Sequence, residues 1–225
     1  MHASKTIPKI VLTYFNIQGV AEKVRLALTL GNIPFQDTRI PFPEWPAIKP
    51  TTPYGQLPLM TIDDAPPFAQ SAAMLRYAGK LATSNGCPLY PDEDYLKIEE
   101  ALGFVSDIQR AWRIPVQVGM DPASLGHDPS ADNSDVVKKV RSDFVANALP
   151  KYFTFLTAKL ASSPYLCGSH PTIADCELVP VLNRMTCGQV DHVPTTCLDD
   201  FPTVQEYVAR FMELEAVKAW YESQA

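Results

Sequence analysis

The spacing of apolar residues changes along the first third of the chain from a strand pattern to a helical one. Residues 9–15, KIVLTYF, form a run of β-branched and aromatic residues typical of a strand. From residue 20 to 30 the apolar residues recur at helical spacing, and Gly31 is placed to end the helix. The predicted buried face carries Val20, Val24, Ala27 and Leu28, and the predicted polar face carries Glu22, Arg25 and Thr29.

Strand signals return between residues 34 and 69, and a second helix follows them. The predicted strands are PFQDTRI at 34–40, LPLMTI at 57–62 and PFA at 67–69, with a turn at Asp63–Asp64 between the last two. Ser71 is a candidate N-cap for a helix with Leu75, Ala78 and Leu81 at helical spacing. The order βαβ followed by ββα predicts a small mixed sheet with helices packed against it.

After a turn-rich stretch, the second half of the chain carries only helical patterns. The first helix there is predicted from the spacing of Ile98, Leu102, Val105, Ile108 and Trp112. Residues 114–134 predict a long loop, helical patterns resume at 136–160, 172–186 and 202–222, and Pro150 and Pro180 are expected to kink or end helices. The chain is therefore predicted to be α+β, with an α/β domain at 1–83, a linker at 84–92 and an all-α domain at 93–225.

Composition and charge narrow the range of partners. Hydrophobic residues make up 46% of the chain, yet no apolar run is long enough to span a bilayer. The net charge of −6 argues against a nucleic-acid partner. Residues 1–84 carry eight Lys/Arg and five Asp/Glu, whereas the remainder carries 11 and 20, so an anionic ligand is better suited to the N-terminal part. Residues 1–15 lack the apolar core of a secretion signal, which predicts a cytoplasmic protein.

Neither the cysteines nor the histidines are spaced for a metal site, so no metal is predicted. The five cysteines contain no CxxC pair, and an odd number argues against a secreted disulfide framework. The four histidines are scattered along the chain. No cysteine precedes Cys87, which excludes the nucleophilic thiol at the start of the first helix that thiol–disulfide exchange requires.

Three N-terminal segments resemble the glutathione-binding domain of cytosolic glutathione S-transferases of the tyrosine type, most of all the sigma class. They are YFNIQGVAEKVRLAL, EWPAIKPTTPYGQLPLM and AQSAAMLRYAG. Two later segments, CGSHPTIADCELV and FPTVQEYVARFMELEAVKAWYES, are similar to the helical domain of the same family. The resemblance implies a thioredoxin-like N-terminal domain, an α-helical C-terminal domain, glutathione as co-substrate, a small electrophile as second substrate, and a homodimer.

Tyr14 stands where the first strand gives way to the helix, and the resemblance assigns it the catalytic role. The glutathione thiol, with a reference pKa of about 8.5, is mostly protonated at neutral pH, so the protein must stabilise the thiolate. A phenol hydroxyl can donate a hydrogen bond to the sulfur anion, helped by the N-terminus of the following helix. Taken alone, an aromatic residue at this position is more often a packing residue.

The resemblance also implies which residues hold the tripeptide. Leu57, before a cis Pro58, would offer its backbone N–H and C=O groups, and Gln70 and Ser71 at a helix N-terminus would bind the γ-glutamyl end. The remaining implied positions are Trp45, Lys49 and Gln56 for the glycyl end, and Asp107, where the partner subunit of family members offers an acidic residue to the glutathione amine. Without the resemblance, Pro58 would be expected trans, and Lys49 and Asp107 would be ordinary exposed charges.

Two positions depart from the family pattern, and each removes a positive charge. Val20 stands where sigma-class members commonly carry Arg, and Gln56 stands where many carry Lys, so thiol activation is expected to be weaker. The electrophile pocket is assigned by position, between the domains, to Phe15, Arg110, Trp112, Trp220 and Tyr221. Thr172 and Asp175 match the S/T-x-x-D capping box, whose role is in folding.

The predicted function is that of a glutathione transferase, which activates the thiolate for attack on electrophilic, hydrophobic substrates. Reduction of hydroperoxides by the same thiolate is a further predicted activity. Two alternatives stay open: a non-catalytic carrier of glutathione or apolar ligands, favoured by Val20 and Gln56, and a glutathione-dependent isomerase such as a prostaglandin synthase. The joint presence of Tyr14, Lys49, Pro58, Gln70 and Ser71 favours the enzyme over the carrier.

Overall fold

The computed structural model describes residues 7–224, and its contacts divide the chain into two compact units. Among the described residues, unit 1 is formed by residues 7–95 together with 214–224, and unit 2 by residues 96–213. The boundaries predicted from the sequence differ at the C-terminal end, because the last helix packs against the first helix of the N-terminal unit. Residues 1–6, which include His2 and part of the segment searched for a secretion signal, lie outside the described residues.

Unit 1 is built on a four-stranded mixed sheet. Its strands are β1 (Ile10–Phe15), β2 (Gln36–Ile40), β3 (Leu59–Ile62) and β4 (Phe68–Ala69). They lie in the order β2-β1-β3-β4, with β1 parallel to β2 and antiparallel to β3, and β4 antiparallel to β3. This is the βαβ plus ββα sheet that the sequence pattern predicts.

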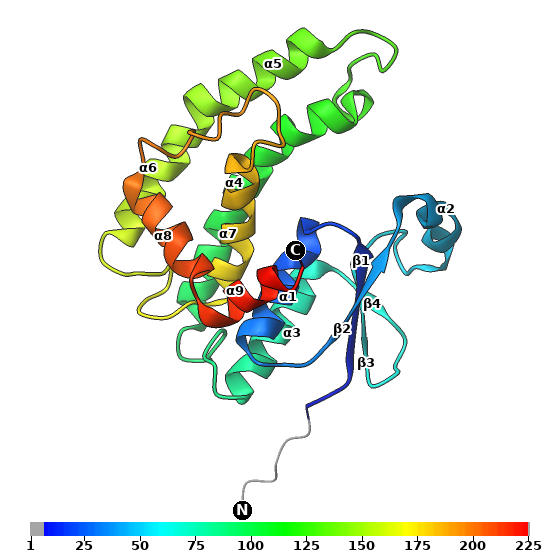
Figure 1. Cartoon of the computed structure of the whole chain (residues 1–225), viewed down its shortest axis with the longest axis vertical. Coiled ribbons are helices and arrows are strands. Elements are labelled where there is room, and N and C mark those ends of the chain that lie inside the picture. Colours follow the sequence, from blue (N-terminus) through cyan, green and yellow to red (C-terminus); the bar gives the residue numbers. More distant parts are fainter. Residues whose placement is uncertain (1–6, 225) are drawn as a thin grey trace, which may run out of the picture. The chain divides into compact units, whose positions relative to one another are not determined.

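Helices cover this sheet and close the core of unit 1. The main ones are α1 (Glu22–Leu30), α3 (Ser71–Ser84) and α9 (Glu215–Glu222), and the short α2 (Trp45–Ile48) follows β2. α1 and α3 pack against each other on one side of the sheet, and α9 packs on α1 (Figure 1). Their shared core includes Val24, Ala27 and Leu28 of α1 and Leu75 and Ala78 of α3, all fully buried as predicted.

The first helix differs from its prediction at three positions. Val20 was expected in the core but is 52% exposed, because it lies in a 3₁₀ turn (Gly19–Ala21) that precedes α1 and turns its side chain off the helical face. Glu22 and Arg25 were expected on a polar face but are 1% and 0% exposed. Their opposite charges, one turn apart, neutralise each other inside the unit.

Unit 2 is entirely helical in its described residues. Its helices are α4 (Tyr95–Met120), α5 (Ser134–Asp143), α6 (Leu149–Leu160), α7 (Ile173–Thr186) and α8 (Pro202–Met212), with a π-helical stretch (Phe144–Ala148) between α5 and α6. The five apolar residues that predicted α4 are all buried. The α+β prediction, a mixed α/β part followed by a helical part, is therefore confirmed.

The predicted 114–134 loop is shorter than expected, because α4 continues through Pro115 to Met120. Trp112, Pro115 and Val118 keep the helical spacing and are all buried, so packing outweighs the hydrogen bond that Pro115 cannot make. The Pro115 carbonyl accepts a hydrogen bond from Nε of the buried Arg141 at 2.9 Å. Pro150 lies in the first turn of α6, where it is tolerated, and Pro180 lies inside α7.

The capping box at the start of α7 is confirmed and has a further partner. Thr172 N–H donates to Asp175 Oδ2 at 2.7 Å, and the Thr172 hydroxyl accepts from Ala174 N–H at 3.3 Å. The other Asp175 oxygen accepts from Leu166 N–H at 3.0 Å and from the Tyr207 hydroxyl at 2.9 Å. Asp175 thus joins the turn before α7 to helix α8.

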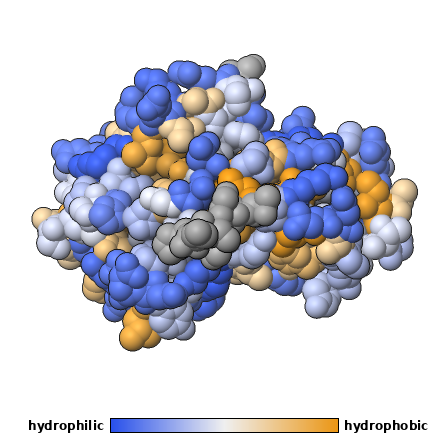
Figure 2. Space-filling view, turned by 90° about the horizontal axis from the view of Figure 1, so that it is seen from below, coloured by the Kyte–Doolittle hydropathy of each residue, from blue (hydrophilic) through white to orange (hydrophobic). Residues whose placement is uncertain are grey.

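The surface mixes polar and apolar residues. On the face shown in Figure 2, hydrophilic residues predominate and apolar residues gather in separate areas between them. Within residues 7–224, no helix combines the length and apolar character that crossing a membrane requires.

Candidate active site around Tyr14

Tyr14 lies near the end of β1 with its side chain largely enclosed. The residue is 8% exposed, and its hydroxyl oxygen accepts a hydrogen bond from the backbone N–H of Val20. Burial raises the pKa of Tyr14 above its ordinary value of 10, and the Val20 N–H and the charge of Arg25 oppose that rise. The phenol therefore keeps its proton at neutral pH, and a hydroxyl that accepts one hydrogen bond becomes a stronger donor through its own hydrogen.

The turn after β1 brings its backbone against the Tyr14 ring. Gly19 has a φ of +48°, in the region that favours glycine. A Cβ atom at this position would lie 2.6 Å from both Cε1 and Oη of Tyr14. Only a residue without a side chain fits there, so Gly19 sets how closely the turn approaches the phenol.

Replacing Gly19 with alanine is therefore expected to displace the phenol. We expect kcat/KM to fall by about 10- to 100-fold, the range that misplacement of a reacting group by about 1 Å produces. The matched control is Gly86→Ala, because Gly86 also has a positive φ (+93°) but no heavy atom lies within 4 Å of its added Cβ. Steady-state kinetics of both variants make the test: equal activities would show that the contact with Tyr14 has no catalytic weight.

Arg25 donates hydrogen bonds to the turn between β1 and α1. Its burial was not predicted from the sequence. Its Nη1 donates to the carbonyl oxygens of Ile17 and Gln18 at 3.1 and 3.0 Å and to Glu22 Oε2 at 3.0 Å. Its Nε donates to Asp37 Oδ1 at 3.0 Å. The signal for this cluster was the opposite charge of Glu22 and Arg25 at a spacing of three, with Asp37 on the neighbouring strand.

The strand register places three predicted site positions at the same end of the sheet. Thr13 pairs with Leu59, and Leu59 pairs with Ala69. The residues that come next at this end are Tyr14 on β1, Pro58 immediately before β3 and Gln70 immediately after β4. Since neighbouring strands lie about 4.8 Å apart, these three predicted residues are neighbours across one end of the sheet.

Gln70 has an unusual backbone conformation. Its φ and ψ are +83° and 95°, which residues other than glycine rarely adopt and which cost of order 1–3 kcal/mol. α3 begins at Ser71, so Gln70 rather than the predicted Ser71 is the N-cap, and its side chain makes no capping hydrogen bond. The first N–H groups of α3 are suited to a carboxylate.

The segment before β3 carries the other backbone position. The Leu57–Pro58 peptide bond is cis, as the glutathione-binding prediction requires. Pro58 is buried, Leu57 is half-buried, and Gln56 is exposed. Leu57 precedes the first residue of β3, so its backbone lies outside the described strand pairs.

Aromatic contacts connect Tyr14 to the loop after β2. Phe15 lies edge-on to both Tyr14 and Trp45, at ring-centroid distances of 5.4 and 5.5 Å, and stacks on Phe42 at 4.6 Å. Trp45 begins α2, and the exposed Lys49 follows its last residue. Trp45 is thus tied to the end of β1, and Lys49 lies one helical turn further along the chain.

The remaining predicted site residues divide between the two units. In unit 2, Asp107 and Arg110 are exposed and form an ion pair at 3.2 Å, whereas Trp112 is buried against Phe144 at a centroid distance of 5.3 Å. In unit 1, Trp220 and Tyr221 are half-exposed on α9.

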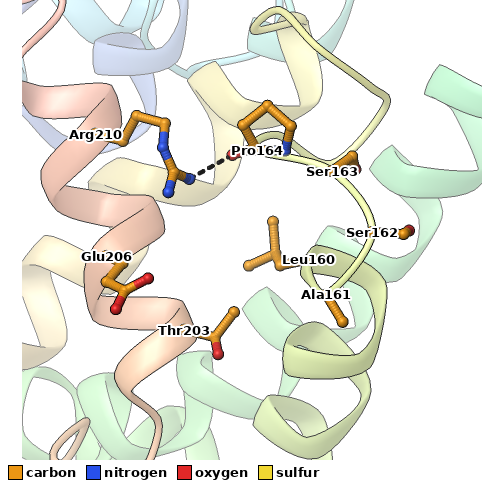
Figure 3. Close-up of a pocket in the computed structure, with 8 residues that line it drawn as sticks. All are labelled: Leu160, Ala161, Ser162, Ser163, Pro164, Thr203, Glu206 and Arg210. Carbon is orange, nitrogen blue, oxygen red and sulfur yellow. Dashed lines mark hydrogen bonds between the residues drawn. The ribbon is translucent and has the colours of Figure 1, made fainter.

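A groove described by the structure lies elsewhere, within unit 2, and contains none of the predicted site residues. It is bounded by the turn after α6 and by one face of α8, where Arg210 donates to the Pro164 carbonyl at 2.9 Å (Figure 3). Its lining residues are Leu160, Ala161, Ser162, Ser163, Pro164, Thr203, Glu206 and Arg210.

The cysteines and the possible metal ligands are described as follows within residues 7–224. All five cysteines are free, and none is on β1 or α1. Burial raises the pKa of the Cys167 thiol to about 11. No group of three or more His, Cys, Asp or Glu residues within 7–224 is arranged to hold a metal ion.

Two family models match the chain, and the second of them includes α9, which packs in unit 1. A family model described as "Glutathione S-transferase, N-terminal domain" matches residues 20–81, and one described as "Glutathione S-transferase, C-terminal domain" matches residues 129–224. A glutathione S-transferase of Anopheles gambiae is 31% identical, over 95% of this chain and 96% of that protein. The chain belongs to the glutathione S-transferase family. Like its homologues, it is a glutathione transferase, and members of this family use glutathione as a co-substrate.

Solved structures of glutathione S-transferases and of a synthase share the fold. Prostaglandin synthase D of Nilaparvata lugens has a TM-score of 0.77 and 26% identity, covering 97% of this chain and 99% of that one. A monomeric glutathione S-transferase of the hookworm Necator americanus has a TM-score of 0.78 and 26% identity, covering 96% and 98%. The thioredoxin-like α/β domain followed by a helical domain, expected from the resemblance, is confirmed by this family fold.

Proposed function

We propose that the protein binds glutathione at the end of the unit 1 sheet and activates its thiolate for attack on electrophilic, hydrophobic substrates. The observation that carries this proposal is the alignment of Tyr14, Pro58 and Gln70 at one end of three adjacent strands. Tyr14 supplies a protonated phenol for the sulfur anion, Leu57 supplies backbone groups for the peptide, and Gln70 with Ser71 supplies a helix N-terminus for the γ-glutamyl carboxylate.

The chemical role of Tyr14 is to stabilise an anion. The glutathione thiol loses its proton to solvent, and the phenol then donates a hydrogen bond to the sulfur, which favours the thiolate over the thiol. Each unit by which the thiol pKa falls corresponds to about 1.4 kcal/mol of preferential thiolate binding. Arg25, whose guanidinium carbon is 5.7 Å from the Tyr14 ring centroid, adds positive charge beside the phenol.

A titration of bound glutathione tests the proposal. The ultraviolet absorbance of the thiolate is followed against pH with glutathione in the presence and absence of saturating protein. We expect the pKa of the bound thiol to lie well below that of free glutathione. Tight binding with an unshifted thiol pKa would contradict the proposal and support the non-catalytic carrier.

The pH dependence of turnover gives a second prediction. Because burial raises the pKa of Tyr14 above 10, the phenol remains a donor at every pH below about 10. We therefore expect kcat/KM to rise through the lowered pKa of the bound thiol and then to stay level up to about pH 10. The uncatalysed reaction of free glutathione is subtracted at each pH, and a falling limb between pH 8 and 9 would contradict the protonated-donor role.

The other site residues complete the proposal. We propose that Trp45, Lys49 and Gln56 contact the glycyl end, with Lys49 pairing with its carboxylate. We also propose a homodimer in which Asp107 binds the glutathione amine at the site of the other subunit. Sedimentation at micromolar concentration tests the dimer, since the Necator americanus relative is described as monomeric.

The second substrate is proposed to bind near Phe15, Arg110, Trp112, Trp220 and Tyr221. Membership of the sigma class and reduction of hydroperoxides are further proposals that rest on the sequence resemblance. A cytoplasmic location is also proposed, from the sequence of residues 1–15. A second candidate function is a glutathione-dependent isomerase, favoured by the likeness to the Nilaparvata lugens prostaglandin synthase. Product analysis with a prostaglandin endoperoxide and with a chlorinated aromatic electrophile distinguishes isomerisation from transfer.

A further inference from the structure

Helix α9 comes from the far end of the chain but belongs to the unit that carries Tyr14. The Trp220 indole packs on Phe35 at a centroid distance of 5.6 Å. Its Nε1–H donates to Glu22 Oε1 at 3.0 Å. Val217, which is fully buried, adds apolar contact from the same helix.

Glu22 connects the Trp220 indole to the buried Arg25, which also pairs with Asp37. Its side chain is 1% exposed, so both carboxylate oxygens need partners inside the protein. Oε1 receives the indole N–H, and Oε2 receives Nη1 of Arg25. The indole therefore fixes the orientation in which Glu22 meets Arg25.

Arg25 in turn shapes the turn beneath the phenol. Nη1 is shared between Glu22 and the carbonyl oxygens of Ile17 and Gln18, so a change in one acceptor alters its hold on the others. Its Nη2 is buried and has no hydrogen-bond partner among the described residues, so Arg25 keeps a buried N–H group available to a new acceptor. The turn that Arg25 holds continues directly into Gly19 and Val20.

We propose that Trp220 is a positioning residue for Tyr14, acting through Glu22 and Arg25. This inference rests on the proposed role of Tyr14 as the thiolate donor. Without the indole N–H, the buried Oε1 of Glu22 turns toward the nearest available donors, which are on Arg25. The Arg25 guanidinium then donates more strongly to the Glu22 carboxylate and more weakly to the carbonyl oxygens of Ile17 and Gln18. The Val20 N–H moves relative to the phenol, and Tyr14 becomes a weaker donor to the thiolate.

The test replaces the indole by a ring of similar position without the N–H. Trp220→Phe keeps an aromatic partner for Phe35 and removes the hydrogen bond to Glu22. We expect the pKa of the glutathione thiol bound to this variant to rise by about 0.5 unit, because only part of the contribution of this one hydrogen bond reaches the phenol. The dissociation constant of glutathione itself, measured well below the pKa of the bound thiol so that no thiolate forms, should stay within about twofold of the native value.

A control variant separates this effect from loosening of the helix. Val217→Ala removes buried apolar contact from α9 and leaves the Trp220 donor in place, so it should lower the unfolding midpoint and leave the thiol pKa unchanged. The inference is overturned if Trp220→Phe leaves the thiol pKa at the native value, or if both variants raise it equally. Failure of the proposed function is a different result, in which the native protein itself does not lower the thiol pKa.

Discussion

Replacing Tyr14 with phenylalanine is expected to lower kcat/KM for an electrophilic aromatic substrate by about 100-fold near pH 7. The change removes the hydroxyl that donates to the thiolate. Loss of one hydrogen-bond donor to an anion in an active site typically lowers the rate constant by 10²- to 10³-fold. The lower figure applies because the N-terminal turn of α1 and the charge of Arg25 remain. The pKa of the bound thiol should return toward that of free glutathione.

Two measurements make this prediction specific to the phenol. Binding of S-alkylated glutathione should be nearly unchanged in Tyr14→Phe, because that ligand carries no thiolate to stabilise. Tyr54→Phe serves as the control, since Tyr54 is 67% exposed and its hydroxyl should have no part in the reaction. A Tyr14→Phe variant with native kcat/KM and a native thiol pKa would remove Tyr14 from the mechanism.

The largest expected effect on stability is at Asp175. Asp175→Ala would leave the N–H groups of Leu166 and Thr172 and the hydroxyl of Tyr207 without their acceptor inside unit 2. A buried donor without an acceptor costs about 1–3 kcal/mol, and relaxation lets some of the three reach water. We expect the free energy of unfolding to fall by about 4 kcal/mol, measured by urea denaturation of the purified variant.

The control for Asp175 is another acidic residue at the start of a helix. Asp135 lies in the first turn of α5 and is exposed, so Asp135→Ala should cost less than about 1 kcal/mol. Tyr207→Phe is expected to lie between them, because it removes one of the donors and leaves the capping box intact. A cost for Asp175→Ala as small as that for Asp135→Ala would show that the capping box does not stabilise the fold.

Local patterns were sufficient to predict most of the elements. The β-branched run of β1 and the apolar spacing of α4 depend on residues close in the chain, and both formed where predicted. The end of α4 was missed because residues 114–134 were predicted to be a loop, although the packing of Val118 and the hydrogen bond from Arg141 sustain the helix. Such support comes from α5 and is invisible in a local window.

Single site residues could be predicted from the sequence, but the way they come together could not. Tyr14, Pro58 and Gln70 could be named one by one, but their alignment required the pairing of β1, β3 and β4. The burial of Arg25 was missed because a charged residue in a helix is ordinarily solvated, although the spacing of three from Glu22 offered it an oppositely charged partner. Its partner Asp37 lies on β2, and only the β1–β2 pairing brings that carboxylate to it.

The 202–222 segment shows the same limit on a larger scale. Its amphipathic pattern predicts one helix, but the extended backbone of Leu214 ends α8 and begins α9. The hydrophobic pattern shows that both parts bury one face, and does not show against which unit. The contacts of Trp220 with Glu22 and Phe35 place α9 in unit 1, and these two partners lie at the opposite end of the sequence.

The position of α9 in the chain has a consequence for biosynthesis. Domains emerging from the ribosome generally fold in order, with the N-terminal one first. Here residues 7–95 leave the ribosome long before residues 214–224, so Glu22 lacks its indole partner until unit 2 has been translated. The segment that carries the tyrosine is made first, yet the last hydrogen bond that supports it forms only after α9 has left the ribosome.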